Sequence, residues 1–145
     1  MRALTGTLPL LSLSLSLLAC SGEAGLPGST SMFPEEAYAT MQGEQGAVTL
    51  EVRTAPTQPP GRGLVTVEYR IQDTAGAPLD GLDLQVLPWM PAMGHGASTH
   101  PLIEAEGEGR YLASKVSFFM PGSWELRSTI SGAVEDRAIV TFQIH

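Results

Sequence analysis

Hydrophobic and polar residues alternate along most of the chain after Gly46. Val48, Leu50 and Val52 are separated by polar residues, and the same alternation runs through 65–71. A period of two is typical of a β-strand with one buried and one solvated face. Similar stretches lie at 82–86, 112–118, 124–130 and 139–144, with a weaker one at 100–105. The pattern predicts about seven strands.

These short strands are separated by turns rich in glycine and proline, and no helical pattern of useful length interrupts them. Such spacing is typical of an antiparallel immunoglobulin-like β-sandwich. A parallel α/β sheet is disfavoured because it needs helices between its strands. We therefore expect one all-β domain over residues 47–145, whose strand order the periodicity leaves open.

The first residues have the features of an export signal. Arg2 is followed by an uncharged stretch of leucine and serine from Leu8 to Leu18. This stretch is shorter than the about 20 apolar residues of a membrane-spanning helix. Residues 1–19 are thus predicted to be a signal peptide, and no disulfide can form within the chain because Cys20 is its only cysteine.

The end of this signal, Leu17-Leu18-Ala19-Cys20, resembles the lipobox of bacterial lipoproteins. The resemblance implies cleavage before Cys20 and attachment of lipid to that cysteine, and acyl chains hold a protein on a bilayer. We expect a membrane lipoprotein that faces the periplasm or the cell surface, with the inner or outer membrane left open. An ordinary signal peptide with a chance cysteine is the alternative.

Residues 20–46 follow the signal and are rich in Gly, Ser, Pro and Glu. They are expected to be a flexible tether between the lipid and the domain. A short helix from Pro34 to Met41 is a second interpretation of part of this segment, because Pro-Glu-Glu suits the first turn of a helix.

Charge excludes some partners. The net charge is −7, and loss of Arg2 with the signal would make it −8. A nucleic-acid partner is therefore not expected, since binding to phosphates needs a basic surface. Electrostatic docking to anionic lipid is also disfavoured, which leaves anchoring to the acyl chains.

The alternation stops between Leu87 and Gly96, where two prolines and two glycines predict a loop in place of a central strand. This segment holds Met90, Met93 and His95, and a second turn holds Met120. Thioether sulfur is a soft donor that selects Cu(I), and imidazole binds copper as well. The alternative is that these methionines fill gaps in the core.

The motifs M-P-A-M-G-H-G from Met90, G-R-Y from Gly109 and F-x-M-P-G-x-W-E-L from Phe118 resemble the YtkA-like domain, which FixH-type proteins share. The similarity covers roughly residues 48–144. It implies an extracytoplasmic immunoglobulin-like sandwich of a family associated with copper handling and cytochrome oxidase assembly. Met90, Met93 and His95 match its Met/His segment and Met120 its second methionine. The chain departs from FixH proteins, which usually carry an N-terminal membrane helix.

His100 follows the loop and could complete a metal site, or it could begin a strand and face solvent. The sequence contains no catalytic constellation, so we do not expect an enzyme. The prediction is a copper-binding lipoprotein, with Cu(I) favoured, that exchanges copper with a donor or acceptor protein. The alternative is an adaptor domain of an envelope or efflux complex, with the Trp/Met loop as a docking patch.

Overall fold

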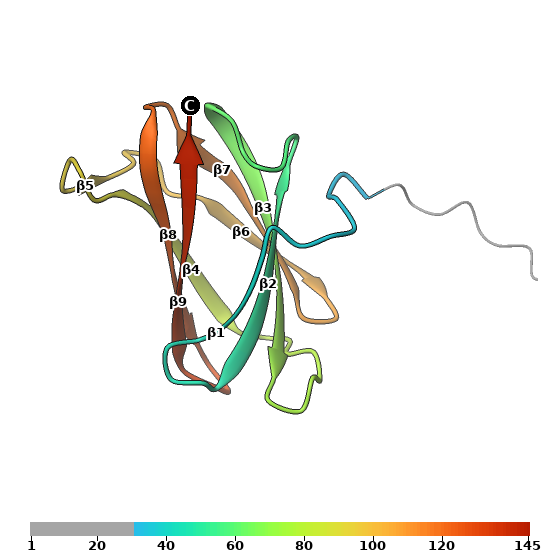
Figure 1. Ribbon diagram of the computed structural model, residues 1–145. Helices are drawn as coiled ribbons and strands as arrows, with labels where there is room; N and C mark the ends of the chain where they lie inside the picture. Colours follow the sequence, from blue (N-terminus) through green and yellow to red (C-terminus); the bar gives the residue numbers. More distant parts are fainter. Residues whose placement is uncertain (1–30) are drawn as a thin grey trace, which may run out of the picture.

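The computed structural model describes residues 31–145, in which two antiparallel sheets pack face to face (Figure 1). The five-stranded sheet has the order β1-β2-β3-β7-β6 and the four-stranded sheet the order β5-β4-β8-β9. The strands in the described part of the chain are β1 (Ala39–Gln42), β2 (Val48–Ala55), β3 (Gly63–Asp73), β4 (Asp83–Met90), β5 (His95–Gly96), β6 (Leu102–Gly107), β7 (Arg110–Phe118), β8 (Gly122–Ser131) and β9 (Asp136–Ile144).

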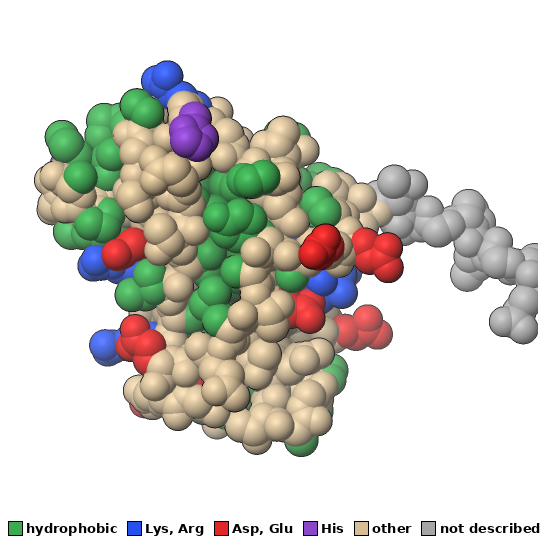
Figure 2. All heavy atoms as spheres, viewed as in Figure 1, with side chains coloured by type: hydrophobic (Ala, Val, Ile, Leu, Met, Phe, Trp, Pro, Cys, Tyr) green, Lys and Arg blue, Asp and Glu red, His purple; other side chains and the backbone are tan. Residues whose placement is uncertain are grey.

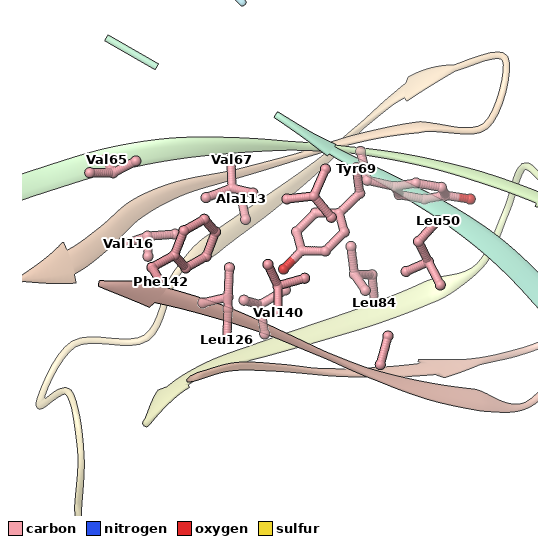
Figure 3. Packing of buried hydrophobic residues seen from close by; sticks show 14 of the residues in the cluster. Leu50, Val65, Val67, Tyr69, Leu84, Ala113, Val116, Leu126, Val140 and Phe142 are labelled. Carbon is pink, nitrogen blue, oxygen red and sulfur yellow. The ribbon is translucent and has the colours of Figure 1, made fainter. Parts of the chain in front are cut away.

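The core lies between the two sheets and is made by alternate residues of their strands (Figure 3). Leu50, Tyr69 and Val116 come from the five-stranded sheet, and Leu126 and Phe142 face them from the four-stranded sheet. Each is fully or almost fully buried. The period-two pattern of the sequence thus becomes the inward face of each sheet.

The all-β sandwich predicted from the sequence is confirmed, with two more strands than expected. The short strand β5 was not predicted, and β1 lies in the segment expected to be a tether. Phe33 is also buried, so the folded domain begins well before residue 47. The suggested helix over 34–41 is wrong. Tyr38 and Ala39 instead join the ladder with Val52, because β2 has a free edge that β1 can pair with.

The signal peptide and Cys20 lie outside the described residues. Within residues 31–145 there is no helix long and apolar enough to cross a membrane.

Strand β4 continues through Pro88 to Met90, although the prolines and glycines of this segment predicted a loop. The prediction fails because β4 is paired along most of its length on one side only, with β8. On its other side β4 pairs only with the two residues of β5. The carbonyl of Pro88 faces that side and accepts a hydrogen bond from the N–H of Ala97 at 2.9 Å. Proline is tolerated where its missing N–H would face an open strand edge.

The strands define two ends of the sandwich (Figure 1). The methionine end, at the top of Figure 1 beside the C-terminus, consists of the loops 56–62, 91–101 and 119–121. The acidic end, opposite, consists of the turns 43–47, 74–82, 108–109 and 132–135. Pairing of Gly63 with Phe118 and of Gly122 with Ile144 places the methionine-end loops of both sheets together.

At the acidic end, the buried side chain of Asp136 links the two sheets. Its carboxylate accepts hydrogen bonds from the backbone N–H of Gln45, Ala47 and Arg137 at 2.8 Å and of Val48 at 3.2 Å. Burial raises the pKa of Asp136, but these four bonds lower it more, so the net pKa lies below its ordinary value. The β1–β2 turn is thereby fixed to β9.

The outer face of the five-stranded sheet has an ion-pair network around fully buried Glu68. Arg110 contacts one carboxylate oxygen at 2.9 Å and Arg70 contacts the other at 3.1 Å. Arg53 lies 3.6 Å away and contacts Glu51 at 2.8 Å. A buried carboxylate needs such partners because desolvation without them is costly.

Candidate metal site at the methionine end

Met90 is the last residue of β4 and is buried in the core, with only 6% of its surface exposed. Its methyl group lies against the β7–β8 turn. A Cβ atom added to Gly122 would stand 2.7 Å from Met90 Cε, so the glycine leaves room for the methionine. The Met90 thioether is therefore beside the turn that carries Met120.

Met120 is partly buried in that turn, which the following strand fixes. Trp124 donates its indole N–H to the carbonyl of Met120 at 2.9 Å. The Trp124 ring packs edge-on against Phe118 with centroids 5.4 Å apart. The backbone of Met120 is thus held by a core aromatic residue, which limits the positions that its side chain can reach.

Met93 lies in the loop that follows β4, and 56% of its surface is exposed. The N–H groups of Met93 and Gly94 both donate to the carbonyl of Met90 at 3.1 Å. Gly94 has a φ of +65°, a left-handed conformation that favours glycine. This tight turn brings the chain back along β4 immediately after Met93.

His95 is the register partner of Met90 in the β4–β5 pair. Partners in an antiparallel pair project their side chains to the same face of the sheet, so His95 extends the face that Met90 occupies. Its ring is exposed, and its Nδ1 lies 3.0 Å from the carbonyl oxygen of Gly96. If Nδ1 donates that bond, Nε2 is the nitrogen available to a metal.

His100 is exposed and belongs to the same loop 91–101, but it lies beside a different surface feature. It lines a hollow of about 630 Å³ that extends over β4, β8 and β9. Leu87, Arg127 and Ile139 are among the other residues that line this hollow, and none of Met90, Met93 or Met120 is. The structure therefore brings Met90, Met93, His95 and Met120 to one end, and places His100 beside a different surface feature.

The donor set at this end is dominated by methionine. No group of three His, Cys, Asp or Glu side chains that could hold a metal occurs within residues 31–145. A site here would thus depend on thioethers, with His95 as the one nitrogen donor beside them. Such a set suits Cu(I), which prefers soft ligands, and suits Ca²⁺ or Mg²⁺ poorly. Two donors are packed against the core and two are exposed, so the residues fit a shallow site at the surface.

Trp89 is only partly buried and does not belong to the core. It alternates with buried Met90 and so faces outward, where Arg127 lies 4.8 Å above its ring. Arg127 also contacts Glu125 at 2.7 Å. Arg127 thereby links β4 and β8 on the outer face of their sheet. A cation–π contact of this kind is worth about 0.5–1 kcal/mol at exposed sites.

Fold and donor set together define a small antiparallel β-sandwich with methionine and histidine gathered at one end. Among known families, the YtkA-like family matches residues 44–129. The chain belongs to the YtkA-like family. The match spans β2 through most of β8 and includes Met90, Met93, His95 and Met120. No curated protein and no solved structure matches the chain.

Sequence reasoning assigned no role to Gly122, although its contact with Met90 joins the two methionine turns. A signal was present, because Pro121-Gly122 directly precedes a strand and glycine is favoured where another group approaches the backbone closely. The identity of that group depends on the pairing of β8 with β4 and β9, which periodicity alone does not give.

Proposed function

We propose that this protein binds copper as Cu(I) at the methionine end, through Met90, Met93, His95 and Met120, and exchanges it with a donor or acceptor protein. The observation that carries the proposal is the contact between Met90 Cε and Gly122, which joins two methionine turns far apart in the sequence. Membership of the YtkA-like family supports the same role. Cu(I) is the cargo in this proposal, and no catalytic step is assigned.

The differing exposure of the donors supports transfer as well as binding. Met90 is buried and Met120 partly buried, whereas Met93 and His95 are exposed. Exposed ligands can be exchanged for those of a partner while the buried ones still hold the ion. His100 would join only if the loop 96–101 moved toward the methionines, so we assign it no ligand role beyond that of a candidate.

The proposed location is the outer side of a bacterial membrane, with the chain anchored by acyl groups on Cys20. The Leu-Leu-Ala-Cys sequence supports this location. A metal site without a free thiol also suits an oxidising compartment, because thioethers form no disulfides.

The test is a competition titration of the protein with Cu(I) against a coloured Cu(I) chelator under reducing conditions. We expect Met90→Leu/Met93→Leu to weaken binding by at least about tenfold, the loss seen when metal sites lose a supporting group. The matched control is Met32→Leu, which changes an exposed methionine outside both turns.

Equal Cu(I) affinity in the Met90→Leu/Met93→Leu variant and the control would refute the copper site. Exposed Met93 and Phe119 would then favour the second candidate function, an adaptor that docks to another envelope protein through this end.

A further inference from the structure

Acidic residues are distributed very unevenly over the molecule. The chain has 15 Asp and Glu residues, yet the loops 56–62, 91–101 and 119–121 of the methionine end contain none. Basic side chains at this end are Arg62, in the first loop, and Lys115, near the end of β7. The residues of the acidic end and its strand termini include Glu44, Asp73, Asp80, Asp83, Glu106, Glu108, Glu135 and Asp136, with Arg110 and Arg137 as the bases.

Figure 2 shows no acidic side chain on the upper part of the face in view, and the acidic side chains visible there lie mainly across its middle. Acids near these loops are Glu125, which pairs with Trp89 next to β5 and contacts Arg127, and Glu35 and Glu36, whose backbone carbonyls accept bonds from Arg53 and from Gln58 beside the first loop. The terminal carboxylate of His145 also lies at this end (Figure 1). The loops themselves carry only neutral and basic side chains.

Large apolar side chains are exposed at the same end. In the described residues, seven large hydrophobic side chains are exposed, and only Leu87 and Ile139 of these lie on the face of the four-stranded sheet. The other five have at least half of their surface exposed: Met93 and Phe119 lie in the methionine-end loops, Leu64 and Leu102 lie next to them in the chain, and Met32 lines a pocket with Leu64. Apolar groups gathered in this way mark an interaction surface.

The chain reaches the domain at this end. Met32 lines a shallow pocket together with Pro56, Leu64 and Lys115. Cys20 precedes Met32 by 12 residues, and 12 residues span at most about 40 Å when fully extended. An acyl group on Cys20 would therefore pull on the domain from the methionine end, within about 40 Å of the bilayer.

We propose that the methionine end is a bilayer-contacting surface, in which Leu64, Leu102 and Phe119 enter the lipid interface and Arg62 and Lys115 face the phosphates. The occupant of this surface is a phospholipid bilayer. The proposal rests on the lipid at Cys20 from the proposed function, and is independent of copper.

Net negative charge does not prevent this orientation. Strand β9 has nine residues and is about 30 Å long at 3.3 Å per residue. The Debye length at physiological ionic strength is only about 8 Å, so a bilayer at the methionine end is screened from the far acids. The opposite orientation would bring the acidic turns against lipid phosphates, which is unfavourable.

The experiment uses the lipidated protein reconstituted in phosphatidylcholine vesicles with a minor share of phosphatidylglycerol. Because Cys20 carries lipid, Leu102→Cys or Ala75→Cys provides one free thiol for a fluorescent label, at the methionine end or the acidic end. We expect a water-soluble quencher to act several-fold more weakly on the label at 102 than at 75. Lipids brominated near the headgroup should quench only the label at 102.

A second variant, read with the same label at 102, tests whether the exposed apolar side chains make the contact with lipid. Leu64→Ser/Phe119→Ser should restore quenching at 102, with a thermal midpoint unchanged because both side chains are exposed. Equal access of the water-soluble quencher to both labels would overturn the proposal. Protection at 102 that appears only at high protein density would also overturn it, because the occupant would be a second copy. A free thiol at Cys20, with protein in the soluble fraction, would instead refute the lipid attachment.

Discussion

At the acidic end, side chains from distant strands hold the turns in place, whereas the loop 91–101 of the methionine end depends on local bonds. Asp136 fixes the β1–β2 turn to β9, and the Tyr111 hydroxyl donates to the carbonyl of Leu79 and accepts from the N–H of Leu82. In contrast, the only side-chain hydrogen bond described for residues 91–101 is that of His95 to its own neighbour Gly96.

This difference teaches where the chain can change without loss of the fold. A turn held by buried polar bonds has few alternatives, because an unpaired N–H inside the protein is costly. A loop held by its own backbone can rearrange around a ligand at little cost to the rest of the molecule. Changes at the acidic end should therefore lower stability, whereas changes in the loop 91–101 should affect the proposed copper binding. The following four tests examine that difference.

The largest effect on stability is expected from Asp136→Ala. It removes the acceptor of four backbone N–H groups in a buried position and should lower the free energy of unfolding by about 3 kcal/mol. Urea denaturation followed by tryptophan fluorescence measures this. Glu135→Ala, at the adjacent residue, is the control and should change little. Equal midpoints for the two variants would contradict the role of Asp136.

The pH dependence of unfolding is the second test. Since the folded pKa of Asp136 is below its unfolded value of about 3.9, its carboxylate stabilises the fold above that value. The contribution is lost as pH falls through the folded pKa. The gap in urea midpoint between the natural protein and Asp136→Asn should therefore be full at pH 7 and shrink below about pH 4. A constant gap down to strong acid would refute the lowered pKa.

Gly122→Ala is expected to act on both properties. The φ of Gly122 is +128°, and an added Cβ would meet Met90 Cε, so the alanine should destabilise the fold by about 1–3 kcal/mol. Displacement of Met90 should also weaken Cu(I) binding in the competition titration. Gly76→Ala, at a positive φ with open space, separates backbone strain from the contact. Unchanged Cu(I) affinity in Gly122→Ala would argue against a shared site.

The smallest effect on stability is expected from Met93→Leu. Because this side chain is exposed, the thermal midpoint should stay within error of the natural protein. Cu(I) affinity should nevertheless fall by about tenfold or more. A loss of stability without a loss of Cu(I) affinity would contradict this prediction and would show that the loop 91–101 stabilises the fold.

Much of the fold could be predicted because the inward residues of β2, β3, β8 and β9 repeat with a period of two. In β7 the period is broken between Ala113 and Val116, where Lys115 has a φ of +59°. Trp124 and Tyr111 also lie in the core. Strand β1 could not be found in the same way, since its four residues pair with an edge and show alternation only weakly. Pro88 in β4 was misinterpreted because the rule against proline depends on which side of the strand is paired, and sequence does not show that.

The candidate site was predicted only as a set of residues. Met90, Met93 and His95 share a segment, so their proximity follows from the chain itself. The approach of the Met120 turn depends on β8 pairing beside β4, which is a tertiary fact. The outward position of Trp89 also depends on pairing, because one residue of shift exchanges the inner and outer faces of a strand.

The position of β1 has a mechanical consequence. A lipid on Cys20 would make the bilayer pull on the chain before residue 31, and that force would reach the domain through buried Phe33 and then β1. Ala39 pairs with Val52 and Gln42 with Thr49, so β1 runs from the methionine end toward the acidic end. A pull toward the membrane is then parallel to the strand and loads its hydrogen bonds with β2 together, in shear, instead of opening them one by one. The Asp136 bonds to the following turn make the other end of this strand the fixed point.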